Sequence, residues 1–409
     1  MLVESIVRQT LGVKRHVVKR VFEEGGGLIV ELDVRAGWRQ PCGTCGTLSR
    51  VRDRLASRDW RHVPLWGIPV TLRYAPTRVR CGSCGRILVE EIPWSQGKCR
   101  LSQGLIWLLS SWCKLLPWEQ VGKLFGVHWN TVATAVRQAV SYGLAHRDLG
   151  GVLYIGIDEI SRRKGHVYVT NVYDLKQKRL IWSGEGRSLE TLKRFFDEHG
   201  NALEGRIKGV CCDMWQPYID MIKLRLPDAV LVFDKFHVVQ KLLQAVDQVR
   251  RDEAHELRKT NPELLKKTRY IWLKNPENLT DKQRARLGHL ERLNLRSNRA
   301  YLLKESFREF WNYSTKAGAR KFLKKWFWWA THSRLKPMRD FAWTMKNHFE
   351  DVLNYFELRI DNGAVEGMNN KAKVVSHRCY GFRTATYYIM ALYHCLGELP
   401  EPEMVHRFL

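Results

Sequence analysis

The stretch that decides the fold runs from Val152 to Asp158 and reads Val-Leu-Tyr-Ile-Gly-Ile-Asp. A short apolar run of this kind is typical of a buried strand. A second run, Ile207-Lys-Gly-Val-Cys-Cys212, is followed by Asp213 in the same way. A carboxylate beside a buried strand is costly unless it is paired or binds a cation. The two aspartates are therefore the first candidates for a functional site.

The segments around these two runs predict a mixed sheet flanked by helices. Three strands at hairpin spacing are followed by a helix, a strand, a helix, a strand and another helix. We expect these elements at Val152–Ile157, His166–Tyr173, Arg179–Ser183, Leu189–His199, Ile207–Cys212, Pro217–Leu226, Ala229–Phe233 and from about Phe236. This is the order of an RNase H-like α/β sheet, in which the strand after the first helix packs beside the first strand, subject to right-handed crossovers. Asp158 and Asp213 are then expected to meet.

A third acid, Glu366, lies in Asn362-Gly-Ala-Val-Glu-Gly-Met-Asn-Asn-Lys371, which predicts a turn followed by a helix. Glu366, Asn369, Asn370 and Lys373 are spaced to share one helix face. That face suits a metal-binding carboxylate with amide and ammonium groups on adjacent phosphate oxygens, although a solvated polar face has the same spacing. Three carboxylates from distant parts of a chain repel one another unless a cation neutralises them, as in Mg²⁺ sites for phosphoryl transfer.

Asp234 also follows a predicted strand, but one position further out in the sheet. We expect it to be a supporting group together with His237, or to pair with Lys235, rather than to be a metal ligand. Asp213 is the preferred second ligand.

The charge of the chain points to a polyanion as its partner. The chain has 68 Lys and Arg against 42 Asp and Glu, for a net charge of +26. The excess lies in the segments flanking residues 151–234, which are themselves close to neutral. Basic flanks around a neutral core suggest nucleic acid gripped on both sides of a cation-binding site. A generically basic protein is the alternative. Membrane binding is not expected, because no basic amphipathic helix or apolar anchor appears.

Two pairs of cysteines predict a structural zinc site. Cys42-Gly-Thr-Cys45 and Cys81-Gly-Ser-Cys84 are tight turns that can aim four thiolates at one Zn²⁺, and four thiolates leave no open position.

No run of about 18 apolar residues and no signal-peptide order occur, so we expect a reducing cytoplasm, where disulfides are unfavourable. The other six cysteines, Cys99, Cys113, Cys211, Cys212, Cys379 and Cys395, are expected in the core.

A helix-turn-helix is predicted after the cysteine pairs. Leu101–Leu116 has helical spacing, Pro117 can start a second helix, and Trp118–Phe125, Gly126-Val127 and Asn130–Val140 predict helix, turn and helix. Asn130 is the expected cap. The second helix would enter a DNA major groove, although plain helical hairpins share this spacing. The side chains expected to be exposed for DNA are His128, Trp129, Asn130, Thr134 and Arg137.

From about residue 241 to 360 the chain predicts a basic α-helical insertion, because the last acid of the site returns only at Glu366. The aromatic run Trp326-Phe-Trp-Trp329 could stack on unpaired bases, but we interpret it as core between helices. The expected organisation is a multidomain α+β protein. It comprises a zinc-binding domain (1–98), a helix-turn-helix domain (99–148), the first part of the catalytic core (149–240), the insertion (241–358) and the last part of the core with C-terminal helices (359–409).

These motifs together resemble the bacterial insertion-sequence DDE transposases of the ISL-three (ISL3) family. The resemblance rests on the cysteine pairs, the helix-turn-helix, Gly156–Ile160 with Arg163-Lys-Gly-His166, and Val365–Lys371 with Tyr380-Gly-Phe-Arg383. Met368 and Ala372 replace aliphatic residues expected there. The resemblance implies a DDE triad at Asp158, Asp213 and Glu366, an RNase H-like core, and a zinc finger and helix-turn-helix that recognise the element's ends.

The leading hypothesis is therefore a cut-and-paste DNA transposase, active in the cytoplasm at the bacterial nucleoid. The triad would hold two Mg²⁺ ions, or Mn²⁺, about 3.5–4 Å apart. Cleavage at the terminal inverted repeats and attack of the freed 3′-hydroxyl on double-stranded target DNA need no ATP, in agreement with the lack of a phosphate-binding G-x-x-x-x-G-K-[ST] loop. Two DNA ends predict a homodimer or larger assembly. The alternatives are an RNase H-like nuclease or resolvase and a domesticated, non-catalytic DNA-binding regulator.

Overall fold

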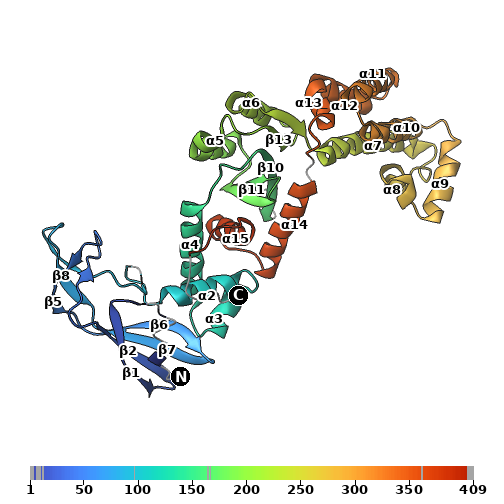
Figure 1. Ribbon diagram of the computed structural model, residues 1–409. Helices are drawn as coiled ribbons and strands as arrows, with labels where there is room; N and C mark the ends of the chain where they lie inside the picture. Colours follow the sequence, from blue (N-terminus) through green and yellow to red (C-terminus); the bar gives the residue numbers. More distant parts are fainter. Residues whose placement is uncertain are drawn as a thin grey trace. The chain divides into compact units, whose positions relative to one another are not determined.

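The computed structural model describes residues 4–5, 11, 13–95, 97–163, 165, 167–360 and 363–402 (Figure 1). The chain forms two compact units, which we call the first unit (residues 1–147 and 375–409) and the second unit (residues 148–374). The chain leaves the first unit once and returns to it after the second. Within the described ranges, every helix is too short or too polar to cross a membrane.

The second unit contains a five-stranded sheet whose strand order is β12-β11-β10-β13-β14. Its elements are β10 (Tyr154–Arg163), β11 (Val167–Asp174), β12 (Arg179–Glu185), α5 (Leu189–Leu203), β13 (Gly209–Cys212), α6 (Gln216–Arg225), β14 (Val230–Phe233) and α7 (Lys235–Glu256). β11 is antiparallel to β10 and β12, whereas β13 and β14 run parallel to β10. The predicted order of elements and the predicted pairing of the fourth strand with the first are confirmed.

The first strand is longer than predicted. β10 continues to Arg163, so Asp158 lies inside the strand and does not end it. The pairing of β10 with β13 nevertheless stops at Gly156, opposite Cys211. Asp158 therefore lies two residues beyond the parallel pairing. His166 and Asn362, which belong to two of the sequence motifs, lie outside the described residues.

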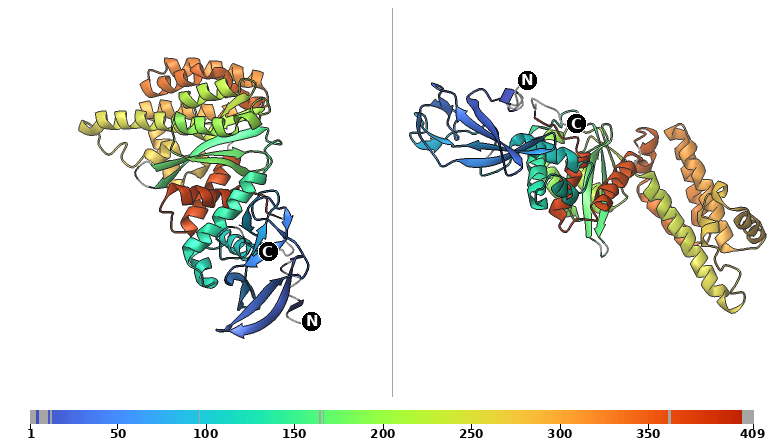
Figure 2. Two further views of the ribbon diagram at one scale, coloured as in Figure 1. Left: turned by 90° about the vertical axis from the view of Figure 1, so that its left-hand side faces the viewer. Right: turned by 90° about the horizontal axis from the view of Figure 1, so that it is seen from below.

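The two faces of β10 are covered by different helices, because successive side chains of a strand point to opposite faces. Ile155 and Ile157 belong to the apolar core that also contains Phe195 of α5. Gly156 lies against the other helix, α14 (Gly363–Arg378), where a Cβ atom on this glycine would come within 2.4 Å of Val365 Cγ2. Glycine at this position lets α14 approach the strand that carries Asp158 (Figures 1 and 2).

A helical insertion follows β14, as predicted, and within its described residues no strand interrupts it. Its helices are α7, η1 (Leu257–Lys259), α8 (Arg269–Leu273), η2 (Pro276–Asn278), α9 (Asp281–Glu291), α10 (Arg296–Arg308), η3 (Glu309–Asn312), α11 (Lys316–His332), α12 (Lys336–Asn347), α13 (Phe349–Leu353) and η4 (Asn354–Phe356). Trp272, Phe307, Phe310 and Trp326 are fully buried in its core. The interpretation of the whole Trp326–Trp329 run as core is wrong, since Trp328 and Trp329 are exposed.

The first unit begins with a four-stranded sheet of order β1-β2-β7-β6. Its strands are β1 (His16–Glu24), β2 (Gly27–Val34), β6 (Arg58–Leu65) and β7 (Ile68–Tyr74), and Trp60, Leu72, Tyr74 and Trp94 form its core. Shorter strands, β3 (Gln40–Pro41), β4 (Leu48–Ser49), β5 (Val51–Arg54), β8 (Thr77–Arg80) and β9 (Ile87–Val89), carry the two cysteine pairs.

The predicted helices of the helix-turn-helix region are confirmed in the same unit. They are α2 (Gln103–Cys113), α3 (Trp118–Leu124) and α4 (Trp129–His146), and α15 (Ala385–Leu396) packs on α4. Gly126 makes the turn with a φ of +59°, where glycine is favoured. The prediction that Asn130 caps α4 is wrong. His128 is the cap, and its Nδ1 accepts a hydrogen bond from the Asn130 amide, so the helix begins one residue before Asn130.

Candidate active site and metal centre

A cavity of about 700 Å³ in the second unit gathers most of the residues predicted for the catalytic site. It lies where β10, the start of α7 and the start of α14 come together. Its lining includes Asp158, Glu159, Ser161, Tyr168, Asp234, Lys235, His237, Glu366, Asn369, Asn370 and Lys373. Asp213 is not among the lining residues.

The carboxylate of Asp158 is held on both oxygens. Asn369 Nδ2 donates to Oδ2 at 2.6 Å, and the Glu159 amide donates to Oδ1 at 2.8 Å. Burial raises the pKa of Asp158, and the charge of Asp234 adds to this effect, while the Glu159 amide, His237 and Asn369 oppose it. The raised pKa means that the groups around Asp158 do not fully compensate the negative charge of its ionised carboxylate.

A row of buried polar side chains connects Asp158 with α14 and the far strands. Ser183 donates to Asn171 Oδ1 at 2.7 Å, Asn171 Nδ2 donates to the Tyr173 hydroxyl at 3.0 Å, and that hydroxyl donates to Asn369 Oδ1 at 2.8 Å. In the sheet register Asp158 is opposite Asn171, and Asn171 is opposite Ser183. These bonds fix the orientation of the Asn369 amide and, through it, the Asp158 carboxylate.

Sequence reasoning missed Asn171, Tyr173 and Ser183, although a signal was present. Asn171 and Tyr173 are two residues apart in a strand whose other members are mostly apolar, so both must point to the same face. Buried polar groups on one face require partners, which Ser183 of β12 and Asn369 of α14 supply.

Asp234 lines the cavity next to His237. It is almost fully buried and caps α7, with its Oδ1 accepting from the Phe236 amide at 2.9 Å and its Oδ2 lying 2.6 Å from His237 Nδ1. Burial alone would lower the pKa of His237, but the hydrogen bond to Asp234 and the charges of Asp213, Asp234 and Asp158 raise it to about 9. The charged partner of Asp234 is therefore His237 rather than Lys235, whose ammonium lies over the Trp311 ring.

Asp213 follows β13 directly and lies near this group. Its Oδ1 accepts from the Met214 amide at 2.6 Å. Its charge acts on His237 and also on Glu159, whose pKa is raised chiefly by burial and further by Asp158 and Asp213. Glu159, which sequence reasoning also missed, is a fourth carboxylate that lines the cavity, beside Asp158, Asp234 and Glu366.

The acids surround the cavity without meeting at one point. Among the described residues, the cysteine cluster is the one group of three or more His, Cys, Asp or Glu side chains whose ligand atoms all lie within 4.8 Å of one another. The donor set still fits a divalent cation, since it consists of carboxylate oxygens, and burial together with the charge of Asp234 penalises the ionised form of Asp158. On α14 Asn369 is buried, whereas Glu366, Asn370 and Lys373 are exposed at the cavity.

The four predicted zinc ligands form a cluster. The ligand atoms of Cys42, Cys45, Cys81 and Cys84 lie within 4.8 Å of one another, and Cys45 Sγ is 3.4 Å from Cys81 Sγ. Hydrogen bonds from Thr47 lower the pKa of Cys45 to about 6, whereas the pKa of Cys84 is raised to about 12, first by its contact with Cys45. Ionisation of one of these thiols therefore disfavours ionisation of its neighbour. A bound Zn²⁺ would stabilise all four thiolates and remove this penalty, so the residues fit this metal.

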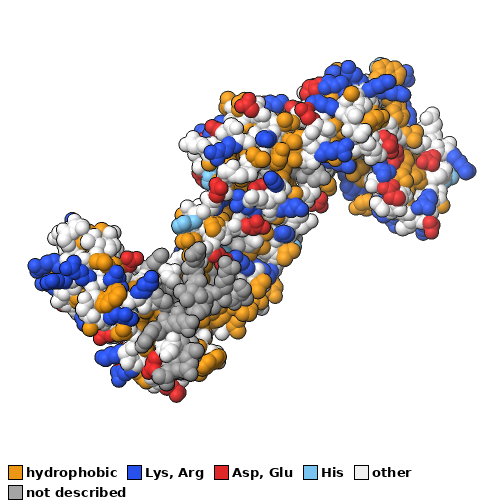
Figure 3. Space-filling model, in the orientation of Figure 1, with side chains coloured by type: hydrophobic (Ala, Val, Ile, Leu, Met, Phe, Trp, Pro, Cys, Tyr) orange, Lys and Arg blue, Asp and Glu red, His pale blue; other side chains and the backbone are white. Residues whose placement is uncertain are grey.

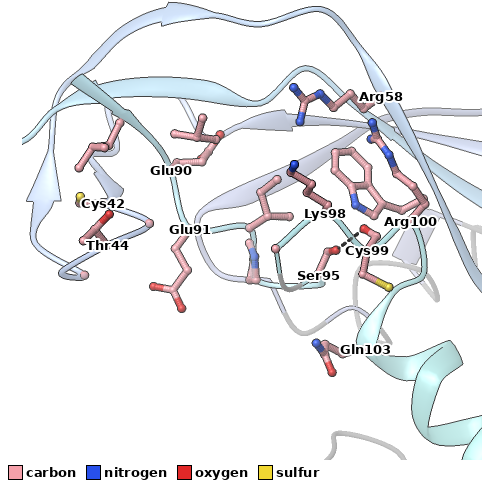
Figure 4. Close-up of a pocket in the computed structure, with 18 residues that line it drawn as sticks. Cys42, Thr44, Arg58, Glu90, Glu91, Ser95, Lys98, Cys99, Arg100 and Gln103 are labelled. Carbon is pink, nitrogen blue, oxygen red and sulfur yellow. Dashed lines mark hydrogen bonds between the residues drawn. The ribbon is translucent and has the colours of Figure 1, made fainter. Parts of the chain in front are cut away.

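Basic side chains lie beside the cysteine cluster and beside α4. A cavity of about 870 Å³ is bordered by the Cys42 turn on one side and by Arg58, Lys98 and Arg100 on another (Figure 4). A second cavity, of about 620 Å³, is lined by Arg61, Arg100, His128, Asn130 and Thr134, among others. Arg61 also donates to the carbonyls of Gly126 and Phe125 at 2.7 and 3.0 Å, which fixes the turn before α4.

The five side chains predicted to be exposed for DNA are all exposed: His128, Trp129, Asn130, Thr134 and Arg137. Two of them have structural bonds as well. His128 caps α4, and the Thr134 hydroxyl donates to the Asn130 carbonyl at 2.9 Å. Trp129 also contacts the rings of His128 and Tyr387, with centroids 5.8 and 6.1 Å apart.

Comparison with known proteins decides which family this arrangement represents. A family of proteins described as transposases matches residues 155–392, a range that contains all three predicted acids. The chain belongs to the ISL3 family of insertion-sequence transposases. It is 30% identical over 354 residues to the transposase for insertion sequence element IS1001 of Bordetella parapertussis, covering 86% of this chain and 87% of that protein.

A second relative of this ISL3 transposase covers nearly the whole chain. The transposase for insertion sequence element IS1557 of Mycobacterium tuberculosis is 29% identical over 432 residues, which span 97% of this chain and 96% of the relative. The expectation of an ISL3 insertion-sequence transposase is confirmed.

Proposed function

We propose that this protein is a DNA transposase that binds the terminal inverted repeats of its insertion sequence, hydrolyses the phosphodiesters at the ends and joins the freed 3′-hydroxyls to target DNA. The observation that carries the proposal is the cavity lined by Asp158 and Glu366, with Asp213 at the end of the neighbouring strand. The strand order supports an RNase H-like core. On one side of β10 lie β11 and β12, which pair antiparallel, and on the other side lie β13 and β14, which run parallel to β10.

Asp158, Asp213 and Glu366 are the residues proposed to hold two Mg²⁺ or Mn²⁺ ions. Bound there, such ions would activate water and stabilise the leaving 3′ oxygen. Asp234 is not assigned as a ligand, because it caps α7 and already has a cationic partner in His237. Asn369 orients Asp158, and Asn370 and Lys373, exposed at the same cavity, are placed to contact DNA phosphates.

The first unit is proposed to recognise the DNA ends. Four thiolates would hold a structural Zn²⁺ that shapes the β-rich part, and α4 would lie in a major groove with Trp129, Asn130 and Arg137 toward the bases. Because two ends must be cut and joined together, we propose a homodimer or larger assembly, acting at the nucleoid.

The test is cleavage of a duplex that contains the element's terminal repeat, with Mg²⁺ or Mn²⁺, by full-length variants. Asp158→Asn, Asp213→Asn and Glu366→Gln should each lower the cleavage rate by at least about 100-fold, since each removes a ligand of the reacting centre. Asp228→Asn is the matched control, because Asp228 is an exposed acid of the same unit outside the cavity. Asp234→Asn should retain more activity than Asp213→Asn.

Cleavage by Asp158→Asn at the wild-type rate would refute the assignment. Metal-dependent cleavage without joining of ends to a target plasmid would indicate a nuclease or resolvase instead. Tight binding of the repeats with no cleavage under any divalent ion would indicate a non-catalytic regulator.

A further inference from the structure

Two helices of the insertion expose three tryptophan side chains. Trp328 and Trp329 of α11 are 62% and 40% exposed, and Trp343 of α12 is 51% exposed. Trp343 packs edge-on against the half-buried Phe327 of α11, with ring centroids 5.1 Å apart. Their neighbour Trp326, by contrast, is buried and donates to the Leu303 carbonyl at 3.0 Å. Only part of the aromatic run therefore contributes to the core.

Lysines surround the most exposed of these rings. Lys321, Lys324 and Lys325 precede Trp328 by seven, four and three residues, which places them on the same face of α11. All three are exposed, and within the described part of the chain no carboxylate is in ion-pair distance of their ammonium groups. We call Lys321, Lys324, Lys325 and Trp328 the Trp328 surface. Figure 3 shows hydrophobic and basic side chains next to one another over the insertion.

We propose that the Trp328 surface binds an unpaired nucleotide of DNA, with the base stacked on the indole and the flanking phosphates on the lysines. The proposal rests on the proposed function, because cutting and transferring a strand separates bases at the element's end from their partners. His332 stacks on the indole of Trp328, at 4.5 Å between centroids and 25° between planes. An exposed indole backed by another ring is a rigid platform for a flat ligand.

Charge and shape together favour this occupant over two others. A duplex whose bases remain paired presents phosphates to lysines but no free base face to the indole. A second copy of this strongly basic chain would bring like charges against the three unpaired lysines. A single-stranded segment offers a base face to the indole of the Trp328 surface and phosphates to its lysines.

The experiment compares two labelled single-stranded oligonucleotides of the same length, one complete and one with abasic sites, by fluorescence anisotropy with full-length, zinc-loaded protein in a buffer without Mg²⁺ or Mn²⁺. Wild-type protein should bind the complete strand about ten-fold more tightly, which is the scale of one base–aromatic stack. Trp328→Ala should abolish that preference and Trp328→Phe should keep part of it. Lys325→Gln should weaken both strands equally and reduce the salt dependence.

Tyr270→Ala is the matched control, because Tyr270 is an equally exposed aromatic of the insertion whose neighbour Arg269 is already paired with Asp247. Asp228→Asn should bind both oligonucleotides as wild type does. The binding assay requires no cleavage, so a failure of the catalytic proposal leaves its result unchanged. Equal binding of the complete and abasic strands by wild-type protein would overturn the inference. So would an equal loss for both strands in Trp328→Ala, or a change in oligomeric mass with no change in strand preference.

Discussion

Replacing Gly156 by alanine should move α14 away from the strand that carries Asp158. The new Cβ atom would lie 2.4 Å from Val365 Cγ2 and 2.7 Å from Leu175 Cδ2, whereas carbon atoms in contact are normally about 3.5–4.0 Å apart. Leu175 can change rotamer, but Val365 is fully buried and β-branched, so its helix must shift by about 1 Å. Overpacking of this kind costs about 1–3 kcal/mol of folding free energy.

The same shift of α14 should affect the cleavage rate more strongly than the free energy of unfolding. Asn369, one turn beyond Val365 on α14, donates to Asp158 Oδ2 at 2.6 Å, and Glu366 lies between them. A displacement of about 1 Å at a catalytic centre costs about 100-fold in rate. The assays are unfolding in guanidinium chloride followed by circular dichroism, and metal-dependent cleavage of a repeat-containing duplex.

A second substitution tests whether the contact with Val365 is the cause. Val365→Ala in the Gly156→Ala background should recover at least about 1 kcal/mol relative to the sum of the two single effects. Gly367→Ala is the matched control on the same helix, because nothing lies within 4 Å of a Cβ atom there. If Gly156→Ala unfolds and cleaves like wild type, or if Val365→Ala gives no recovery, α14 does not pack on β10 as described.

Three further predictions concern the hydrogen-bond row, the zinc site and a buried histidine. Tyr173→Phe should lower the free energy of unfolding by about 1–3 kcal/mol, because it removes the buried hydroxyl that bonds Asn171 Nδ2 and Asn369 Oδ1. Tyr270→Phe at an exposed position should change the free energy little in the same denaturation assay. Cys81→Ser should reduce the bound zinc, measured by elemental mass spectrometry on purified protein, from one per chain to well below one, and should lower the thermal midpoint. Burial lowers the pKa of His62 to about 4, below the value of about 6.5 in the unfolded chain, so the unfolded state gains a proton first as the pH falls. Stability should therefore drop between about pH 6.5 and 4 by up to about 1.4 kcal/mol per pH unit, and His62→Gln should flatten that part of a pH–stability profile; an unchanged slope would contradict the burial of a neutral ring.

The order of the elements in the sheet of the second unit and in the helix-turn-helix could be predicted from sequence because each has a local cause. Apolar runs of strand length, helical spacing and the turn at Gly126 do not depend on the rest of the fold. The pairing of β13 with β10 followed from topology alone. The cysteine pairs were predictable because their spacing and glycines already form the two turns.

The parts that sequence reasoning missed depend on contacts across long distances. The length of β10 beyond Asp158 is set by its pairing with β11 as far as Val167, which no local pattern near Asp158 reveals. The bond between Tyr173 and Asn369 joins residues 196 positions apart. The exposure of Trp328 next to buried Trp326 depends on which face of α11 meets α10 and α12.

The central claim is that Asp158, Asp213 and Glu366 hold divalent cations from three separate elements. The most direct measurement is anomalous diffraction at the manganese edge from crystals of the Asp228→Asn control and of Asp158→Asn, each grown with Mn²⁺ and an uncleavable end duplex. The control should give anomalous peaks within coordination distance, about 2.0–2.4 Å, of carboxylate oxygens of all three acids, and Asp158→Asn should lose at least one of them. Peaks placed at other carboxylates, or three acids that stay apart with the metal and DNA bound, would contradict the account.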